Sequence, residues 1–285
     1  MPIRLESSGD PLRRQRLVGL RLCPRYPYLF PTVEPTRSLK VEIMRHSRKF
    51  LTGVVTLLST LVLGLGSASV SAETIAIIGT GSVANALGPA FAGFGHDIVY
   101  GSRDPNRESV QSLVARTGNS ASATTPAEAA ADADAILLAV PWNAVEAVVA
   151  SLGDLSGKVV IDPTNPRIVG DDGLRDYAVE TSNGELIQGW APNARVVKAF
   201  NTMGWETMLD PDASGGPVTV PIVGNDDDAK AFVAELARGL GLDPIDLGPI
   251  RYAHAIESLY LLWGNAATLG NPFQYHFRRG PRPER

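Results

Sequence analysis

The sequence has 285 residues, of which 44% are hydrophobic, 20% are charged and 28 are glycine. These proportions are typical of a globular protein and exclude a disordered, collagen-like or coiled-coil chain. The single cysteine excludes a disulfide framework and any cysteine-based zinc or iron–sulfur site. The length allows one or two domains with a sizeable core.

The formal net charge of -4 is unevenly distributed along the chain. Residues 1–49 contain eleven Lys or Arg but four Asp or Glu, so the remainder of the chain is strongly acidic. An acidic surface repels the phosphate backbone of a nucleic acid. The charge distribution therefore argues against nucleic acid as a partner.

An export signal is predicted at residues 44–72. A basic stretch at 45–49 precedes an apolar run over 50–65, and small residues ending at Ala72 follow at the positions that a signal peptidase reads. This order predicts a secretory signal peptide that is cleaved after Ala72, which would leave the mature protein exported, in the periplasm, without membrane contact. The alternative is an uncleaved membrane anchor, although the run is shorter than the roughly 20 apolar residues that a spanning helix needs. If the signal does not function, the protein stays in the cytoplasm.

Residues 1–43 do not fit in front of a signal peptide. They are rich in Arg and Pro and have neither the helix nor the strand period. We therefore predict that Met44 is the true start and that 1–43 form a disordered, non-native upstream extension.

From residue 73 onwards, apolar strands alternate with helices. The predicted strands cover 74–78, 97–100, a short stretch near 121, 135–140 and 158–161. The predicted helices continue from 84 to 93 and cover 108–116, 126–131 and 142–152. Continuous apolar strands alternating with helices are typical of a parallel sheet buried on both faces. The pattern predicts an α/β fold of the Rossmann type, with a doubly wound, mainly parallel sheet, over residues 73–202.

The second half of the chain continues less regularly. Helices are predicted over 185–190, 227–240 and 253–269, and strands over 195–200, 217–223 and 244–246. We expect residues 203–270 to form a small α/β or helical C-terminal extension on the acceptor side of the fold. Residues 271–285 are predicted to be a disordered basic tail.

The first strand is followed by the sequence Gly79-x-Gly81-x-x-Ala84. A strand, this spacing and then a helix form the fingerprint of a dinucleotide-binding turn. Gly79 allows the tight turn, Gly81 allows a diphosphate to approach the backbone, and Ala84 lets the helix pack closely on the sheet. The free N–H groups and the dipole of the helix N-terminus attract an anion. The alternative, an ordinary glycine turn, does not account for this context.

The end of the second strand indicates which dinucleotide is bound. An NAD site has an acidic residue there, whereas this chain has Gly101-Ser102-Arg103. A hydroxyl and a guanidinium can bind a 2′-phosphate, so the sequence predicts NADP(H) as the cofactor. Arg107 is either a second phosphate ligand or a solvated helix arginine, and the sequence leaves both interpretations open.

The stretch from Ile75 to Arg103 resembles the deazaflavin (coenzyme F420)-dependent NADP oxidoreductases and the related N-terminal domain of pyrroline-5-carboxylate reductases. A metazoan metalloreductase domain is similar in layout. The resemblance covers nearly all of 74–265. Its further segments are 140–142, 196–202, 223–227, 247–249 and 256–259.

This resemblance implies where each part of the cofactor lies. It places the diphosphate against Thr80, Gly81, Ser82 and Val83, the 2′-phosphate against Ser102 and Arg103, and the nicotinamide against Val140, Pro141, Trp142, Ala199, Phe200 and Asn201.

The function predicted from these features is an NADP-dependent oxidoreductase that transfers a hydride between NADP(H) and a small redox acceptor. A flavin or deazaflavin as co-substrate is implied by the resemblance alone. Hydride transfer between stacked rings depends on alignment, and the cofactor supplies the chemistry, so no catalytic acid or base is assigned. The alternative is a non-catalytic exported NADP-binding module or sensor.

Other polar residues carry weaker predictions. Lys198 could contact an acceptor, but a lysine at a strand end is expected to point into solvent. His254 and Glu257 lie one helical turn apart and could reach the crevice, although a surface or interface pair is the preferred interpretation. Asp226 and its two acidic neighbours are interpreted as a helix N-cap rather than a cation site, and no metal is predicted.

The last predicted helix carries apolar residues at helical spacing. They are Ile256, Leu259, Tyr260 and Trp263. This face could form a homodimer or could pack against the chain's own sheet, and the sequence leaves both open.

Overall fold

The computed structural model describes residues 72–280. The predicted upstream extension (1–43) and all but the last residue of the predicted signal peptide (44–72) lie outside this range.

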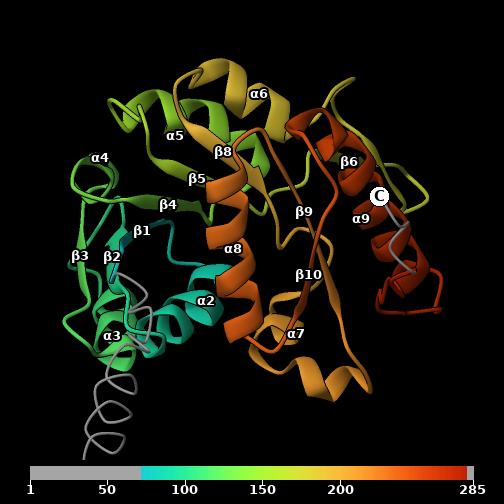
Figure 1. Ribbon diagram of the computed structural model, residues 1–285, viewed down its shortest axis with the longest axis horizontal. Helices are drawn as coiled ribbons and strands as arrows, with labels where there is room; N and C mark the ends of the chain where they lie inside the picture. The colour runs from blue at the N-terminus through green and yellow to red at the C-terminus, as the bar shows by residue number, and fades with distance from the viewer. Residues whose placement is uncertain (1–71, 281–285) are drawn as a thin grey trace, which may run out of the picture. The chain divides into compact units, whose positions relative to one another are not determined.

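An eight-stranded sheet forms the centre of the molecule, with the order β10-β9-β8-β5-β4-β1-β2-β3 (Figure 1). The strands are β1 (Thr74–Ile78), β2 (Asp97–Gly101), β3 (Ser122–Thr124), β4 (Ala135–Leu138), β5 (Val159–Asp162), β8 (Arg195–Lys198), β9 (Thr219–Gly224) and β10 (Asp243–Asp246). Neighbouring strands from β3 to β8 pair in parallel. The chain runs outward from β1 to β3 and then returns to β4 on the other side of β1. The sheet is therefore doubly wound, as the sequence predicts.

Helices cover both faces of the sheet and bury alternate residues of its strands. On one face lie α2 (Ser82–Gly93), α3 (Glu108–Thr117) and α8 (Asp227–Gly239). On the other lie α4 (Pro126–Ala131), α5 (Val145–Ser151), α6 (Asn183–Trp190) and α9 (Ala253–Thr268). Within β1, Ile75 and Ile77 join the first core, whereas Ala76 and Ile78 join the second. Burial on both faces explains why the strands are continuously apolar.

The chain changes direction after β8. It passes through the short helix α7 (Trp205–Leu209) and a 3-10 turn (Pro211–Ser214), and β9 then pairs with β8 antiparallel. No helix carries the chain back across the sheet between these two strands, so β9 starts at the edge where β8 ends. Helix α8 does make such a crossover, and β10 is accordingly parallel to β9. Both strands extend the same sheet rather than forming one of their own.

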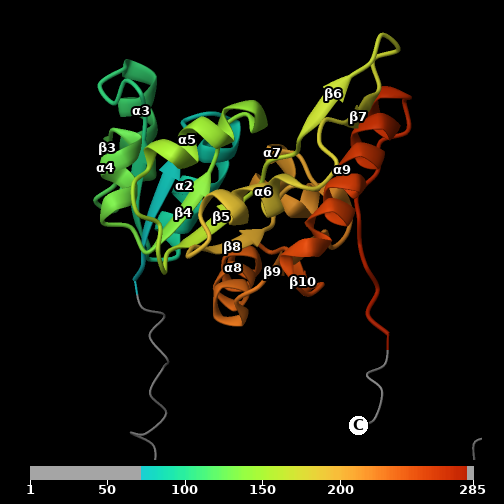
Figure 2. The same ribbon diagram turned by 90° about the horizontal axis from the view of Figure 1, so that it is seen from above.

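A two-stranded hairpin, β6 (Arg167–Val169) and β7 (Arg175–Tyr177), projects beside α9 (Figure 2). This hairpin is not among the predicted elements, because each of its strands has three residues, too few to show the alternation of a half-buried strand, and Ile168 and Val169 are exposed. The hairpin is held by hydrogen bonds to α9, in which Arg175 Nη1 donates to the carbonyl of Gly264 at 2.7 Å. Because the hairpin is held by contacts to a helix about 90 residues further along the chain, no pattern of neighbouring residues in the sequence indicates it.

Residues 271–280, which the sequence analysis assigned to a disordered tail, make hydrogen bonds to the sheet edge. Thr219 N donates to Tyr275 O at 2.8 Å, and Phe277 N donates to Thr219 Oγ1 at 2.8 Å. The rings of Tyr275 and Phe277 lie 6.1 Å apart, so aromatic contacts accompany these bonds. Residues 281–285 lie outside the described range.

Two strand ends differ from the prediction in ways that affect the site. β4 ends at Leu138 rather than at 140, and the segment predicted as a helix from 142 begins as a 3-10 turn, Trp142–Ala144. Between residues 72 and 280, no helix is long and apolar enough to cross a bilayer.

Candidate functional site

The carboxyl ends of β1, β2, β4, β5 and β8 meet at one edge of the sheet. The chain leaves β1 toward one side and β4 toward the other, so this edge holds the topological switch point. In doubly wound sheets a ligand binds in the crevice outside the strand ends at that point. Every site residue predicted from the sequence follows one of these strands.

The turn after β1 requires glycine at position 79. Gly79 has a φ of +108°, and its N–H donates to Gly101 O at 2.9 Å, which links the ends of β1 and β2. A Cβ at this position would lie 2.3 Å from the carbonyl oxygen of Ala139, at the end of β4. Only a residue without a side chain fits between the three strand ends.

Gly81 caps helix α2 and leaves its first turn open. No side chain caps this helix, its first turn has no acidic residue, and a Cβ on Gly81 would meet no atom within 4 Å. The backbone N–H groups at the start of α2 are therefore accessible to an anion, and the helix dipole favours one there. Ala84, in contrast, is fully buried, as close packing of α2 on the sheet requires. This geometry fits a diphosphate.

Two residues that the sequence analysis did not assign hold this turn. Asn85 Nδ2 donates to Thr80 O at 3.1 Å and to Gly81 O at 2.9 Å, while its Oδ1 accepts from Arg116 Nη2 at 2.5 Å. Arg107 Nη2 donates to Thr80 Oγ1 at 3.2 Å, so this exposed side chain lies beside the turn, and its role as a phosphate ligand stays a prediction. The position of Asn85, four residues after Gly81 on the helix, could have indicated its role. That of Arg116 depends on the packing of α3 on α2.

Ser102 and Arg103 follow β2 beside this turn. Ser102 is buried, its N–H donates to Thr124 O at 2.9 Å, and its Oγ accepts from Asp104 N at 3.2 Å. A hydroxyl that accepts one hydrogen bond can still donate one. Arg103 is exposed. A buried hydroxyl and an exposed guanidinium at this strand end suit a phosphate group.

At the other side of Gly79, the end of β4 supplies Val140, Pro141 and Trp142. Val140 Cγ1 would lie 3.1 Å from a Cβ on Gly79, so this side chain borders the turn. Pro141 is exposed and Trp142 is half-buried. Val140 thus borders the turn after β1, and the placement of a nicotinamide against Val140, Pro141 and Trp142 stays a prediction.

The end of β8 contains a backbone conformation that is rare for non-glycine residues. Phe200 has a φ of +61°, and its ring packs 6.4 Å from that of Phe91. Ala199 is fully buried in the core, so its backbone rather than its side chain is what can reach a ligand. The left-handed residue turns the chain at the strand end and places Asn201 and Thr202 beyond it.

Asn201 forms a reciprocal pair with Asn165, which follows β5. Asn165 Nδ2 donates to Asn201 O at 2.8 Å, and Asn201 Nδ2 donates to Asn165 Oδ1 at 2.9 Å. Among the described residues, two buried side-chain atoms have no hydrogen-bond partner, Asn201 Oδ1 and Thr202 Oγ1. An unpaired buried polar atom costs about 1–3 kcal/mol. A polar ligand group at this strand end would remove that cost.

The predictions for Lys198 and Glu257 were wrong. Lys198, the last residue of β8, has no exposed surface, and its Nζ lies 2.8 Å from Asp162 Oδ2 and 2.5 Å from Glu257 Oε1. It also donates to Thr164 O. Glu257 is therefore buried, whereas His254 turns away from it, with Nδ1 against Thr181 O. The hydrophobic faces of α6 and α9 cover this strand end and exclude the solvent that a terminal lysine usually reaches.

The carboxylates of Asp162 and Glu257 determine the direction in which the pKa of Lys198 is shifted. Burial favours the uncharged amine, but Asp162 and Glu257 outweigh it and raise the pKa of Lys198 above its ordinary value. Burial raises the pKa of Glu257, although the charge of Lys198 opposes this shift. The direction of the shift favours the charged form of Lys198 at the centre of the cluster.

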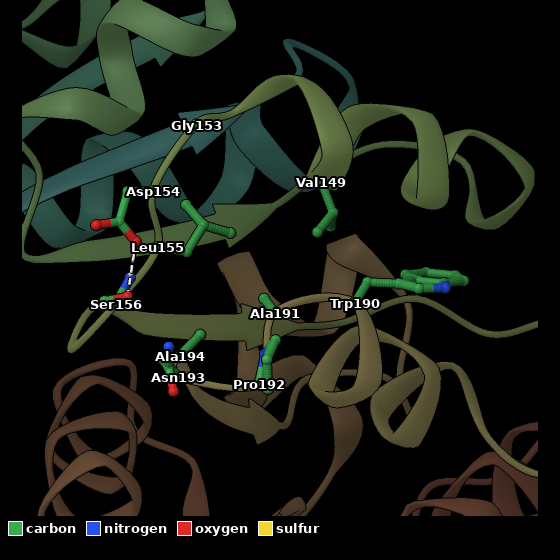
Figure 3. A pocket seen from close by; sticks show the side chains of 10 residues that line it. All are labelled: Val149, Gly153, Asp154, Leu155, Ser156, Trp190, Ala191, Pro192, Asn193 and Ala194. Atoms are coloured by element: carbon green, nitrogen blue, oxygen red, sulfur yellow. Dashed lines mark hydrogen bonds between the residues drawn. The ribbon is translucent and has the colours of Figure 1, made fainter.

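A cavity lies at the opposite edge of the sheet. It has a volume of about 150 Å³ and is lined by residues 153–156 and 190–194, together with Val149 (Figure 3). In it, Ser156 Oγ donates to Asp154 Oδ1 at 2.6 Å. These segments precede β5 and β8, so the cavity lies at the amino ends of the strands, away from the crevice.

Within residues 72–280, Asp226 is the N-cap of α8, as predicted, and its Oδ1 accepts from Ala229 N at 2.7 Å. The cap and the dipole of α8 account for the acidic residues at this point.

The doubly wound sheet, the glycine turn and the open helix N-terminus together define a dinucleotide-binding protein of the Rossmann type. A family model described as NADP oxidoreductase, coenzyme F420-dependent, matches residues 74–166. The F420-dependent NADP reductase of Methanothermobacter thermautotrophicus is 32% identical over 200 residues, which are 65% of this chain and 85% of that reductase. The chain belongs to the F420-dependent NADP oxidoreductase family.

Two further proteins are similar to this chain. The crystal structure of a candidate F420-dependent NADP reductase from Arthrobacter sp. FB24 aligns with a TM-score of 0.66 and 33% identity, covering 73% of this chain and 100% of that one. Metalloreductase STEAP3 of Rattus norvegicus is 30% identical over 191 residues, which are 67% of this chain and 37% of the metalloreductase. The chain thus spans little more than a third of the length of that relative.

The two glycines of the turn should respond differently to alanine. Gly79→Ala forces a side chain into a left-handed conformation and against Ala139 O, so it should lower the free energy of unfolding by at least about 1–3 kcal/mol. Gly81→Ala meets no neighbouring atom and should change it by less than about 1 kcal/mol. Urea unfolding followed by circular dichroism would measure both. Equal losses would contradict this account of the turn.

Proposed function

We propose that the protein binds NADP(H) along the carboxyl edge of the sheet and transfers a hydride between it and a small redox acceptor. The observation that carries this proposal is the open N-terminus of α2 at Gly81, with Ser102 and Arg103 beside it. The family assignment supports the same reaction class. When bound, the nicotinamide would supply the hydride, and the protein's own residues bind, orient and shield the reacting rings.

At the adenosine half, the backbone N–H groups of Ser82 and Val83 bind the diphosphate. Ser102 and Arg103 bind the 2′-phosphate, since β2 ends without a carboxylate that would repel it. Arg107 holds the Thr80 side chain and adds a second positive charge near the phosphates.

At the nicotinamide half, Val140 and Trp142 form an apolar border, and Asn201 and Thr202 offer the polar atoms that lack a partner in the described part of the chain. Precise alignment of donor and acceptor rings lowers the barrier to hydride transfer without requiring an acid or base. The residues 203–270 would then form the acceptor side of the site.

For the acceptor we propose a flavin or deazaflavin. The support is the family, whose model and whose Methanothermobacter relative are both described as F420-dependent. The alternative of a non-catalytic NADP-binding module gains no specific support from the described residues.

We also propose that residues 44–72 direct export. Strand β1 begins at Thr74, so a cleavage after Ala72 leaves two residues ahead of Ile75, the first fully buried residue of the strand. The homodimer remains a prediction. Of its four residues, Ile256 is buried in the chain's own core, whereas Leu259, Tyr260 and Trp263 are half-buried and remain available for a contact.

Replacing the guanidinium at position 103 should affect NADPH and NADH differently. Arg103→Ala should weaken NADPH binding by about 1.5–3 kcal/mol, roughly 10- to 150-fold, and leave NADH nearly unchanged, because the 2′-phosphate is present in NADPH alone. Isothermal titration calorimetry measures both constants. Arg238→Ala is the control, because that exposed arginine on α8 pairs with Glu235. Equal losses for the two nucleotides would refute the assignment of Arg103.

The acceptor can be tested by the loss of NADPH absorbance in the presence of flavins, deazaflavins, quinones and imines. We expect at least one flavin or deazaflavin to oxidise NADPH. Tight NADPH binding with no oxidation by any of these compounds would favour the non-catalytic module instead.

Export is tested by expressing the chain from Met1 and from Met44 in a bacterial host and determining the N-terminus of the protein from the periplasm. The expected N-terminus is Glu73 for the chain that begins at Met44, and the chain that begins at Met1 should be exported less efficiently because residues 1–43 precede its signal. A protein that stays in the cytoplasm with its N-terminus intact would contradict the signal peptide.

A further inference from the structure

The cluster around Lys198 joins four elements at the carboxyl edge of the sheet. Lys198 and Asp162 are register partners at the ends of β8 and β5, Glu257 comes from α9, and Asn183 begins α6. Asn183 N donates to both oxygens of Glu257 at 3.0 and 3.2 Å, and Asn183 Nδ2 donates to Thr164 Oγ1. Thr164 Oγ1 in turn donates to Asp162 Oδ1 at 2.6 Å. The hydrogen bonds therefore close into a ring.

This ring is more costly than a structural role requires. Removing a charged group from water costs several kcal/mol, and well-packed uncharged residues often replace a buried ion pair without loss of stability. Lys198 and Asp162 have no exposed side-chain surface, and the Glu257 side chain has 4%. Stability alone therefore does not explain this cluster of charges. The cluster indicates that the residues around it must be held in fixed positions.

Three members of the ring are connected to the Asn165–Asn201 pair through the chain or through a hydrogen bond. Thr164 precedes Asn165 directly in the chain. Lys198 lies three residues before Asn201 and binds the carbonyl of Thr164. Glu257 follows Ile256, whose carbonyl oxygen accepts from Asn201 Nδ2 at 3.4 Å. A shift of Thr164, Lys198 or Glu257 would therefore move a partner of Asn201.

We propose that Lys198, together with Asp162 and Glu257, is a positioning residue for the reaction, which fixes the Asn165–Asn201 pair and α9 so that Asn201 and Thr202 meet the nicotinamide half of the cofactor. The ring does not touch the cofactor and transfers no proton. This proposal rests on the proposed NADP(H) site, and its effect is confined to the nicotinamide half of that site.

The test compares binding of NADPH with binding of 2′,5′-ADP, which carries the adenosine half alone. In Lys198→Met, two carboxylates remain buried without their cation, so this variant should also lose stability. The triple variant Lys198→Met, Asp162→Asn, Glu257→Gln removes all three charges at similar volume and should regain it. Lys230→Met is the matched control, because Lys230 is also largely buried and binds two carboxylates, Asp227 at 2.9 Å and Asp246 at 2.8 Å, away from the crevice.

We expect the triple variant to melt close to the wild type and to bind 2′,5′-ADP within twofold of it. Its affinity for NADPH should nevertheless fall at least about tenfold, and the emission of bound NADPH should shift toward that of the free nucleotide. Lys230→Met should leave the ratio of the two affinities unchanged. Once an acceptor is identified, the kcat of the triple variant should fall by a larger factor than its KM rises.

Three results would overturn the proposal. The triple variant could bind NADPH as the wild type does, it could lose 2′,5′-ADP and NADPH equally, or it could fail to fold, which would make the charges a matter of stability. Failure of the proposed function is distinct from these, because the wild type itself would then bind neither 2′,5′-ADP nor NADPH.

Discussion

The turn at Gly79 brings the ends of three strands within contact distance of one another. Its N–H reaches Gly101 at the end of β2, and its α-carbon faces the carbonyl of Ala139 at the end of β4. Because no side chain intervenes, α2 starts directly at the switch point, with its first-turn N–H groups open to the crevice. In the proposed function, the diphosphate, the 2′-phosphate and the nicotinamide would all be placed relative to this turn.

The two halves of the proposed NADP(H) site are built by different means. The adenosine half uses backbone groups and residues close in the chain, and its side chains at Arg103 and Arg107 are exposed. The nicotinamide half uses a rare backbone conformation at Phe200 and a buried ring of hydrogen bonds around Lys198. Phosphates need charge and accessible N–H groups, whereas hydride transfer needs rings held in a narrow range of positions. Exposed charges and backbone N–H groups suit the phosphates, and a buried, fixed arrangement of side chains suits the alignment of the rings.

The direction of the strands also places the candidate site and the cavity at opposite edges of the sheet. Parallel strands gather their carboxyl ends at one edge, whereas the cavity lined by residues 153–156 and 190–194 lies at the amino ends. Strand β9 is antiparallel to β8, and β10 is parallel to β9. Both therefore extend the sheet beyond β8 without adding a carboxyl end to the edge that holds the candidate site. Helix α9, which follows β10 in the chain, contributes Glu257 to the buried cluster at the ends of β5 and β8.

The order of strands and helices, the glycine turn and the Ser102–Arg103 pair could be predicted from the sequence by itself, because apolar periodicity and turn chemistry are properties of neighbouring residues. The buried state of Lys198 could not, and the pattern at the strand end indicated the opposite. Its partners lie 36 residues away at Asp162 and still further along the chain at Glu257, and the hairpin β6–β7 likewise depends on contacts to α9. The tertiary structure decided these features, because whether a charge is paired or solvated depends on which distant elements pack over it.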